Sequence, residues 1–129
     1  MSKDIDDRLR DLADRHAGRT GETGGEVMRV PVNIYEAEEA LVVVAPLPGV
    51  MPDDITVAVE DGELHISAAM RSPAAKDYIT HEWHYGPFER TVALPDGFGG
   101  GGTATYGNGQ LAIRLTRGSG GGQVPVKPA

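Results

Sequence analysis

The sequence predicts an all-β protein, an antiparallel β-sandwich spanning residues 28–117, and three observations support this. Between Met28 and Arg117 the apolar residues recur at every second position, which is the period of a strand rather than of a helix. The tight-turn sequences Asp61-Gly62 and Gly107-Asn108-Gly109 each separate two such segments. The segments are short, seven or eight in number, and divided by turn signals, which is typical of a sandwich.

The predicted strands follow one another in a simple order. The first carries apolar residues at 30, 32 and 34, and the second is the continuous apolar run 41–45, which the turn PLPG at 46–49 ends. A hairpin follows over 54–68, and the loop RSPAAK at 71–76 leads to segment 78–85, which is rich in strand formers. A strand with apolar residues at 88, 92 and 94 comes next, and a last hairpin joins 104–106 to 111–115. The stretch FGGGG at 98–102 is predicted to be a loop that no side chain anchors.

The two ends of the chain differ from this central domain. Residues 1–27 form a predicted arm with a short amphipathic helix over 3–17 and a glycine-rich linker, because Ile5, Leu9 and Leu12 make one thin apolar stripe. The stripe is consistent either with a partner-seeking arm or with a frayed, solvated terminus. Residues 118–129 form a predicted flexible tail, since glycines dominate its first half.

The composition argues against several classes of function. The net charge of −7 disfavours nucleic-acid binding, and the absence of cysteine excludes disulfides, thiolate catalysis and zinc–thiolate sites. No apolar run suggests a signal peptide or a membrane span, so we expect a cytoplasmic protein that does not bind membranes. The His81-Glu82-Trp83-His84 stretch is not expected to bind metal, because on a strand the two histidines would point to opposite faces.

No catalytic motif is present, so we expect neither an enzyme nor a cofactor. The carboxylate pairs Glu38-Glu39 and Asp53-Asp54 lie beside turns, where acids are usually solvated or cap a helix. A carboxylate hydrolase would require Asp53 or Glu82 to face another acid across a pocket.

The order of strand and turn motifs resembles the α-crystallin domain of small heat-shock proteins. The matching elements are PVNIYE at 31–36, LPGV at 47–50 with DDI at 53–55, VEDGELHIS at 59–67, YGPFERTVALP at 85–95 and the A-x-Y-x-NG-x-L pattern at 104–111. Val124-Pro125-Val126 also resembles the C-terminal tripeptide of this family. The sequence departs from the family at 99–102, where a glycine run replaces a charged, partly apolar turn, and in an N-terminal arm that lacks aromatic residues.

The resemblance implies an immunoglobulin-like sandwich and a chaperone function that needs no ATP. Such a holdase binds partly unfolded client proteins, prevents their aggregation and assembles through dimers, with a higher oligomer expected. The alternative is a scaffold or accessory module of the same fold, without general chaperone activity, in a specific assembly.

Two regions are candidates for the dimer interface. Because alternate residues of a strand share a face, Arg90 lies on the apolar face of its strand with Phe88 and Val92. The resemblance implies that this arginine lies at the dimer interface and pairs with a carboxylate. The alternative is that the Arg90 side chain extends to water. Segment 78–85 is predicted either to pair with a neighbouring subunit, with Tyr78, Ile79 and Trp83 supplying apolar contacts, or to form an ordinary strand within the chain.

The tail is predicted to dock along a sheet edge. Pro125 keeps the chain extended, so Val124 and Val126 point to the same side. The resemblance implies docking between two edge strands of another subunit, in a groove that would be lined here by Val57, Val59, Ala104 and Tyr106. Residues 118–123 reach ~20 Å when fully stretched, which allows docking either to a neighbour or to the same chain.

Overall fold

The structure of the protein is a computed structural model that describes residues 27–70 and 74–129. The predicted N-terminal helix and most of its linker lie outside these residues. The described elements are β1 (Met28–Arg29), β2 (Asn33–Ala37), β3 (Ala40–Pro46), the 3-10 turn η1 (Pro52–Asp54), β4 (Ile55–Glu60), β5 (Glu63–Ala69), β6 (Pro87–Ala93), β7 (Gly102–Gly107), β8 (Gln110–Leu115), β9 (Gly122–Gln123) and β10 (Val126–Pro128). In this part of the chain, no helix has the length and apolar character that crossing a membrane requires.

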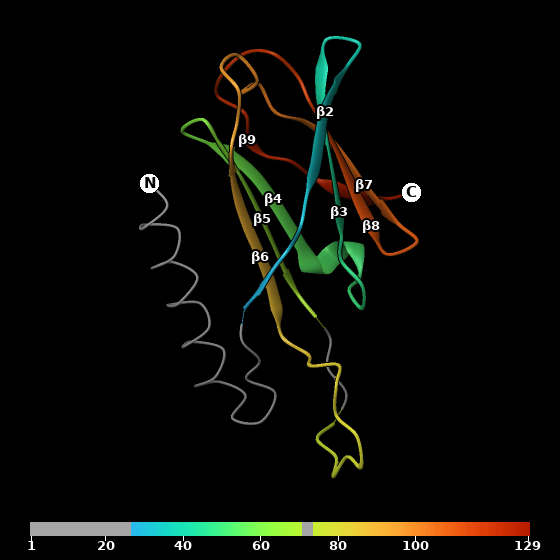
Figure 1. Cartoon of the computed structure of the whole chain (residues 1–129). Coiled ribbons are helices and arrows are strands. Elements are labelled where there is room, and N and C mark those ends of the chain that lie inside the picture. Colours follow the sequence, from blue (N-terminus) through green and yellow to red (C-terminus); the bar gives the residue numbers. More distant parts are fainter. Residues whose placement is uncertain (1–26, 71–73) are drawn as a thin grey trace.

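The strands form two five-stranded sheets, which confirms the predicted all-β sandwich (Figure 1). The first sheet has the order β1-β6-β5-β4-β9 and the second has the order β10-β7-β8-β3-β2. The pairs β4–β5 and β7–β8 are the two predicted hairpins, and both are antiparallel. The short strands β1 and β10 instead run parallel to β6 and β7.

The core lies between the two sheets and is aliphatic, as the alternating sequence pattern predicts. In β3, Leu41, Val43 and Ala45 are buried while the residues between them are partly exposed. Leu64 and Ile66 of β5 are buried in the same way and belong to the same apolar cluster as the β3 residues. Two-residue periodicity therefore sends one face of each sheet into a shared core.

The predicted hairpin turns have the left-handed backbone that their sequences favour. Asp61 and Gly62 have φ values of 51° and 75°, and Asn108 and Gly109 have 52° and 74°. Positive φ at both central residues is typical of a type I′ turn, whose twist matches that of the flanking strands. The β2–β3 turn adopts positive φ as well.

The first predicted strand is divided in two. Val30 is buried and Val32 is half-buried, but Ile34 is exposed, so the alternation does not continue into one buried face. Pro31 has no N–H to contribute to a ladder. β1 accordingly ends before it and pairs with β6, whereas β2 begins after it and pairs with β3 in the opposite sheet.

The glycine-rich loop after β6 has a side-chain anchor that the sequence analysis missed. Phe98 is only 2% exposed and belongs to the core cluster. The Arg117 guanidinium lies 4.4 Å from the centre of its ring, within the range of a cation–π contact. The expectation of an unanchored FGGGG loop was therefore wrong.

Candidate functional site

The groove of interest lies where the two sheets present neighbouring edge strands. β4 is at one side of this seam and β7 is at the other, and each is paired on its outer edge with a short strand of the C-terminal tail. The tail adds β9 to β4 and β10 to β7, so it crosses from the first sheet to the second (Figure 1). A single tail segment therefore connects the two layers of the sandwich.

On the β4 side, the tail pairs with the two valines that the sequence singled out. Gly122 lies opposite Val59, and the backbone N–H of Val124 donates a hydrogen bond of 2.8 Å to the carbonyl oxygen of Val57. Val124 is 2% exposed and belongs to the core cluster. Its side chain therefore closes the seam between the sheets.

On the β7 side, the pairing is parallel. Val126 lies opposite Ala104, and Pro128 lies opposite Tyr106. The N–H of Ala129 donates to the Tyr106 carbonyl oxygen at 2.9 Å, while the Tyr106 hydroxyl donates to the backbone carbonyl of Leu47. Val126 is half-buried and packs against the core cluster.

The four predicted lining residues and the tail motif are thus together in this structure. Pro125, between the two valines, is exposed, which fits a residue that has no N–H to contribute to a strand ladder. Burying one valine side chain stabilises the docked tail by roughly 1.5–3 kcal/mol, before the entropic cost of ordering the chain is subtracted. An attachment of this size is reversible.

Segment 78–85 forms no strand in the described residues, so the alternative of an ordinary intrachain strand does not hold here. It belongs to a connection that extends away from the sandwich (Figure 1, yellow). Ile79 is fully exposed at 104%, Trp83 is 57% exposed and Tyr78 is 42% exposed. Large apolar side chains at such exposure are available to a partner.

Ring contacts shape this exposed segment. Tyr78 stacks on His81 with ring centres 4.3 Å apart, and the rings of His81 and His84 are 4.4 Å apart. Because the segment is not a strand, the expectation that the two histidines point to opposite faces was wrong. Within residues 27–70 and 74–129, no group of three or more His, Asp or Glu is placed to hold a metal ion.

Arg90 lies on β6 with part of its guanidinium buried. Its Nη1 donates a hydrogen bond of 2.9 Å to the Val30 carbonyl oxygen, whereas its buried Nε has no partner within the described chain. Burial of the guanidinium, with a smaller contribution from the positive charge of Arg29, lowers the pKa of Arg90 below its usual value. The side chain therefore does not simply extend into water, and it retains a free donor.

The carboxylate pairs have local structural contacts. One oxygen of Asp54 accepts a hydrogen bond of 2.9 Å from the Met51 N–H, which closes η1. The Oε2 atom of Glu38 lies 3.6 Å from Nη2 of Arg114, and the two exposed side chains form an ion pair in the second sheet. A carboxylate hydrolase would need Asp53 or Glu82 to face another acid across a pocket, and both of these residues are exposed.

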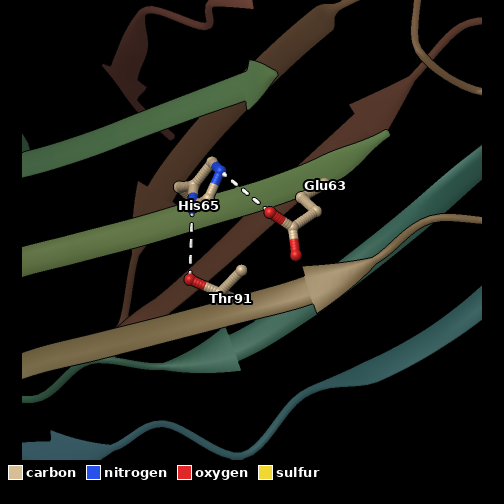
Figure 2. A network of polar contacts seen from close by, with 3 residues as sticks. All are labelled: Glu63, His65 and Thr91. Atoms are coloured by element: carbon tan, nitrogen blue, oxygen red, sulfur yellow. Dashed lines mark hydrogen bonds and ion pairs between the residues drawn. The ribbon is translucent and has the colours of Figure 1, made fainter. Parts of the chain in front are cut away.

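One further polar group lies on the outer face of the first sheet (Figure 2). His65 Nδ1 and the Thr91 hydroxyl are 3.1 Å apart, and His65 Nε2 is 3.8 Å from a Glu63 carboxylate oxygen. The three residues could suggest a catalytic triad, with Thr91 as nucleophile, His65 as base and Glu63 as the acid that orients the base. The 3.8 Å between His65 and Glu63 is, however, too long for the hydrogen bond that orients a base. His65 and Thr91 are register partners, so the group is a cross-strand contact between β5 and β6.

Comparison with known proteins agrees with this geometry. The sequence pattern of the Hsp20/alpha crystallin family matches residues 33–125. A 19.0 kDa class II heat shock protein of Oryza sativa subsp. japonica is 34% identical over 99 residues. That alignment covers 67% of this chain but 57% of the rice protein, so the chain spans little more than half the length of this curated relative.

Two of the solved structures of similar fold also resemble this chain in sequence. The hspA of Xanthomonas axonopodis is 34% identical, with a TM-score of 0.62 over 70% of this chain and 94% of that one. The Del-C4 mutant of hsp14.1 from Sulfolobus solfatataricus P2 is 27% identical, with a TM-score of 0.62 over 87% and 99% of the two chains. The strand order, the tail motif and these matches together place the chain in the Hsp20/alpha-crystallin family of small heat-shock proteins.

Proposed function

We propose that this protein is a holdase that needs no ATP, binds partly unfolded proteins and prevents their aggregation. Its family supports a chaperone role in general. The observation that carries the specific proposal is an apolar seam between β4 and β7 that a short tail segment covers through a few backbone bonds. Displacing the tail would uncover Val57 and its neighbours, which are apolar surface suited to an exposed hydrophobic stretch of a client.

We propose that the working unit is a dimer. Two features support this, the exposed segment with Tyr78, Ile79 and Trp83 and the position of β2 at the outer edge of the second sheet. Tyr35 of β2 is itself 53% exposed. An edge strand and an extended apolar segment are complementary, because the segment can pair with the unpaired backbone of the edge.

Arg90 is proposed to contribute to the same interface. Its buried Nε lacks an acceptor within the described residues, and an unpaired buried donor is costly. A carboxylate from a second subunit would satisfy this donor and compensate the charge. Arg90 as a whole is half-buried, so a second subunit can meet its exposed part, whereas Nε becomes accessible to a carboxylate only when the side chain shifts.

The test is aggregation of two unrelated client proteins on heating, followed by light scattering, with and without ATP. We expect suppression of both at near-equimolar ratios and no effect of ATP. The double variant Val124→Asp, Val126→Asp uncovers the seam and should suppress aggregation at a lower ratio. If neither the natural chain nor the double variant protected either client, the holdase proposal would be rejected. That result would favour the alternative, an accessory module in a specific assembly.

A further inference from the structure

We propose that two glycine-rich segments, 97–102 and 118–122, form an intrachain latch that holds the C-terminal tail in the groove of its own subunit. We call this pair of segments the glycine latch. The glycine latch determines which subunit's tail fills the groove, whatever the protein binds.

Backbone hydrogen bonds join the two segments directly. Gly118 donates to the carbonyl oxygen of Gly97 at 2.9 Å, Gly99 donates to that of Gly118 at 3.0 Å, and Gly121 donates to that of Gly99 at 2.9 Å. Phe98 and Gly118 form a parallel bridge. The stretch between β8 and β9 is therefore attached along its length to the loop between β6 and β7, although its composition alone predicts a free tether.

At two positions of the glycine latch the packing leaves no room for a side chain. A Cβ on Gly121 would lie 2.6 Å from the backbone nitrogen of Gly101 and 2.9 Å from the Gly99 carbonyl oxygen. A Cβ on Gly100 would lie 2.5 Å from the carbonyl oxygen of Arg117. Neither glycine has a positive φ, so the requirement at both positions is space rather than backbone conformation. The two glycine runs therefore fit each other.

Side chains secure one end of the glycine latch. Phe98 is buried in the core at the start of the first segment, and Arg117 covers its ring just before the second segment begins. The N–H of Thr116 donates to the Gly101 carbonyl oxygen at 2.8 Å. These contacts fix where the tail leaves β8, so the segment that follows starts from a defined position.

The latch also shortens the free length of tail that docking to another subunit would need. Gly121 is bonded to Gly99, and Val124 follows only three residues later. Three residues span at most about 11 Å when fully extended. A tail held at Gly121 therefore reaches the β4–β7 seam of its own subunit, whereas the groove of a neighbour becomes accessible only after the latch opens. With the latch closed, the tail fills the groove of its own subunit and does not link one subunit to another.

Cysteine crosslinking can test the topology, because the natural chain has no cysteine. Thr105 and Lys127 are register partners and both are exposed, so Thr105→Cys and Lys127→Cys should not disturb folding. With a short bismaleimide, the double variant should give an intrachain product of monomer mass. A co-refolded mixture of the two single variants should give no mixed crosslink. Crosslinks between T105C and K127C chains at a yield similar to that of the double variant would overturn docking within the subunit.

A second pair of variants, made in the double-cysteine background, tests the latch itself. Gly121→Ala inserts a Cβ into the Gly99–Gly101 backbone and should lower the intrachain yield several-fold, with interchain products appearing. Gly120→Asn is the matched control, since Gly120 lines an open recess of about 710 Å³, has nothing within 4 Å of its Cβ position and has a φ of 76° that asparagine tolerates. Equal intrachain yields for the two variants would overturn the latch. The readout is crosslink topology, so a protein that fails to protect clients can still show the latch.

Discussion

Replacing Val124 by alanine is the most direct measure of how firmly the tail is attached. Val124 is 2% exposed, lies in the seam between the sheets and contributes no polar side-chain contact. The change removes two methyl groups and leaves the backbone hydrogen bond from residue 124 to the Val57 carbonyl oxygen chemically intact. Any loss of attachment therefore reports the buried apolar surface.

The expected magnitude follows from the atoms removed. Burial contributes about 0.8 kcal/mol for each methyl or methylene group, which gives about 1.6 kcal/mol for two. The cavity left behind adds to this, so the loss is about 2 kcal/mol. Since 1.4 kcal/mol corresponds to a factor of ten, the docked population should fall by about 30-fold relative to the undocked one.

Native-state hydrogen exchange measures this equilibrium at a single amide. The N–H of residue 124 is hydrogen-bonded when the tail is docked, so its protection factor should fall by about 30-fold in Val124→Ala. Val126→Ala is the matched control. Val126 is half-buried, so we expect a loss of about 1 kcal/mol and a fall of roughly five-fold.

Amides of the inner strands provide the reference. Protection at β5, which lies away from the tail in the first sheet, should change far less than protection at residue 124. If the amide of residue 124 kept its protection in Val124→Ala, the valine would not be what holds the tail. If β5 lost protection equally, the tail would be part of the global folding unit rather than a separate reversible element.

The remaining predictions concern the interface, the loop anchor and a strained turn. Arg90→Ala should raise the dimer dissociation constant by at least 30-fold, about 2 kcal/mol, in sedimentation on dilution, and an unchanged constant would place the guanidinium outside the interface. Phe98→Ala should lower the free energy of unfolding by about 3 kcal/mol in denaturant, with a loss under 1 kcal/mol contradicting its role as an anchor. Glu39→Gly should raise Tm by several degrees, since glutamate at a φ of 64° costs about 1 kcal/mol, whereas Glu36→Gly within β2 should lower it. Equal shifts for both glycine variants would refute the strain at Glu39.

The sequence was sufficient for the sandwich because strand periodicity and turn chemistry are local signals. Leu41, Val43 and Ala45 alternate with less buried neighbours in β3, and Asp61-Gly62 adopts the left-handed turn that its residue types favour. The Glu38–Glu39 turn is the instructive exception. Its residue types do not favour positive φ, and the pairing of β2 with β3 imposes it.

Segment 78–85 shows where the local signals become insufficient. Its β-branched and aromatic residues suggest a strand, but a strand requires a neighbour with a free edge. In the described residues it has none, so its rings contact one another instead, as in the Tyr78–His81 and Trp83–Tyr85 pairs. Propensity identifies a segment that can pair, whereas the presence of a partner within or outside the chain decides whether it does.

The glycines are a second case in which local sequence signals are insufficient, because one residue type has two physical roles here. At Gly62 and Gly109 the backbone has positive φ and there is open space around the Cβ position, so the requirement is conformational and the flanking turn sequence reveals it. At Gly100 and Gly121 the φ is ordinary and the requirement is the close approach of another backbone. That approach joins positions about twenty residues apart and follows from no local pattern. Flexible linkers and tightly packed backbone segments are both rich in glycine. A glycine-rich tail and a glycine-rich loop in one chain should therefore be tested as packing partners before they are treated as two independent flexible linkers.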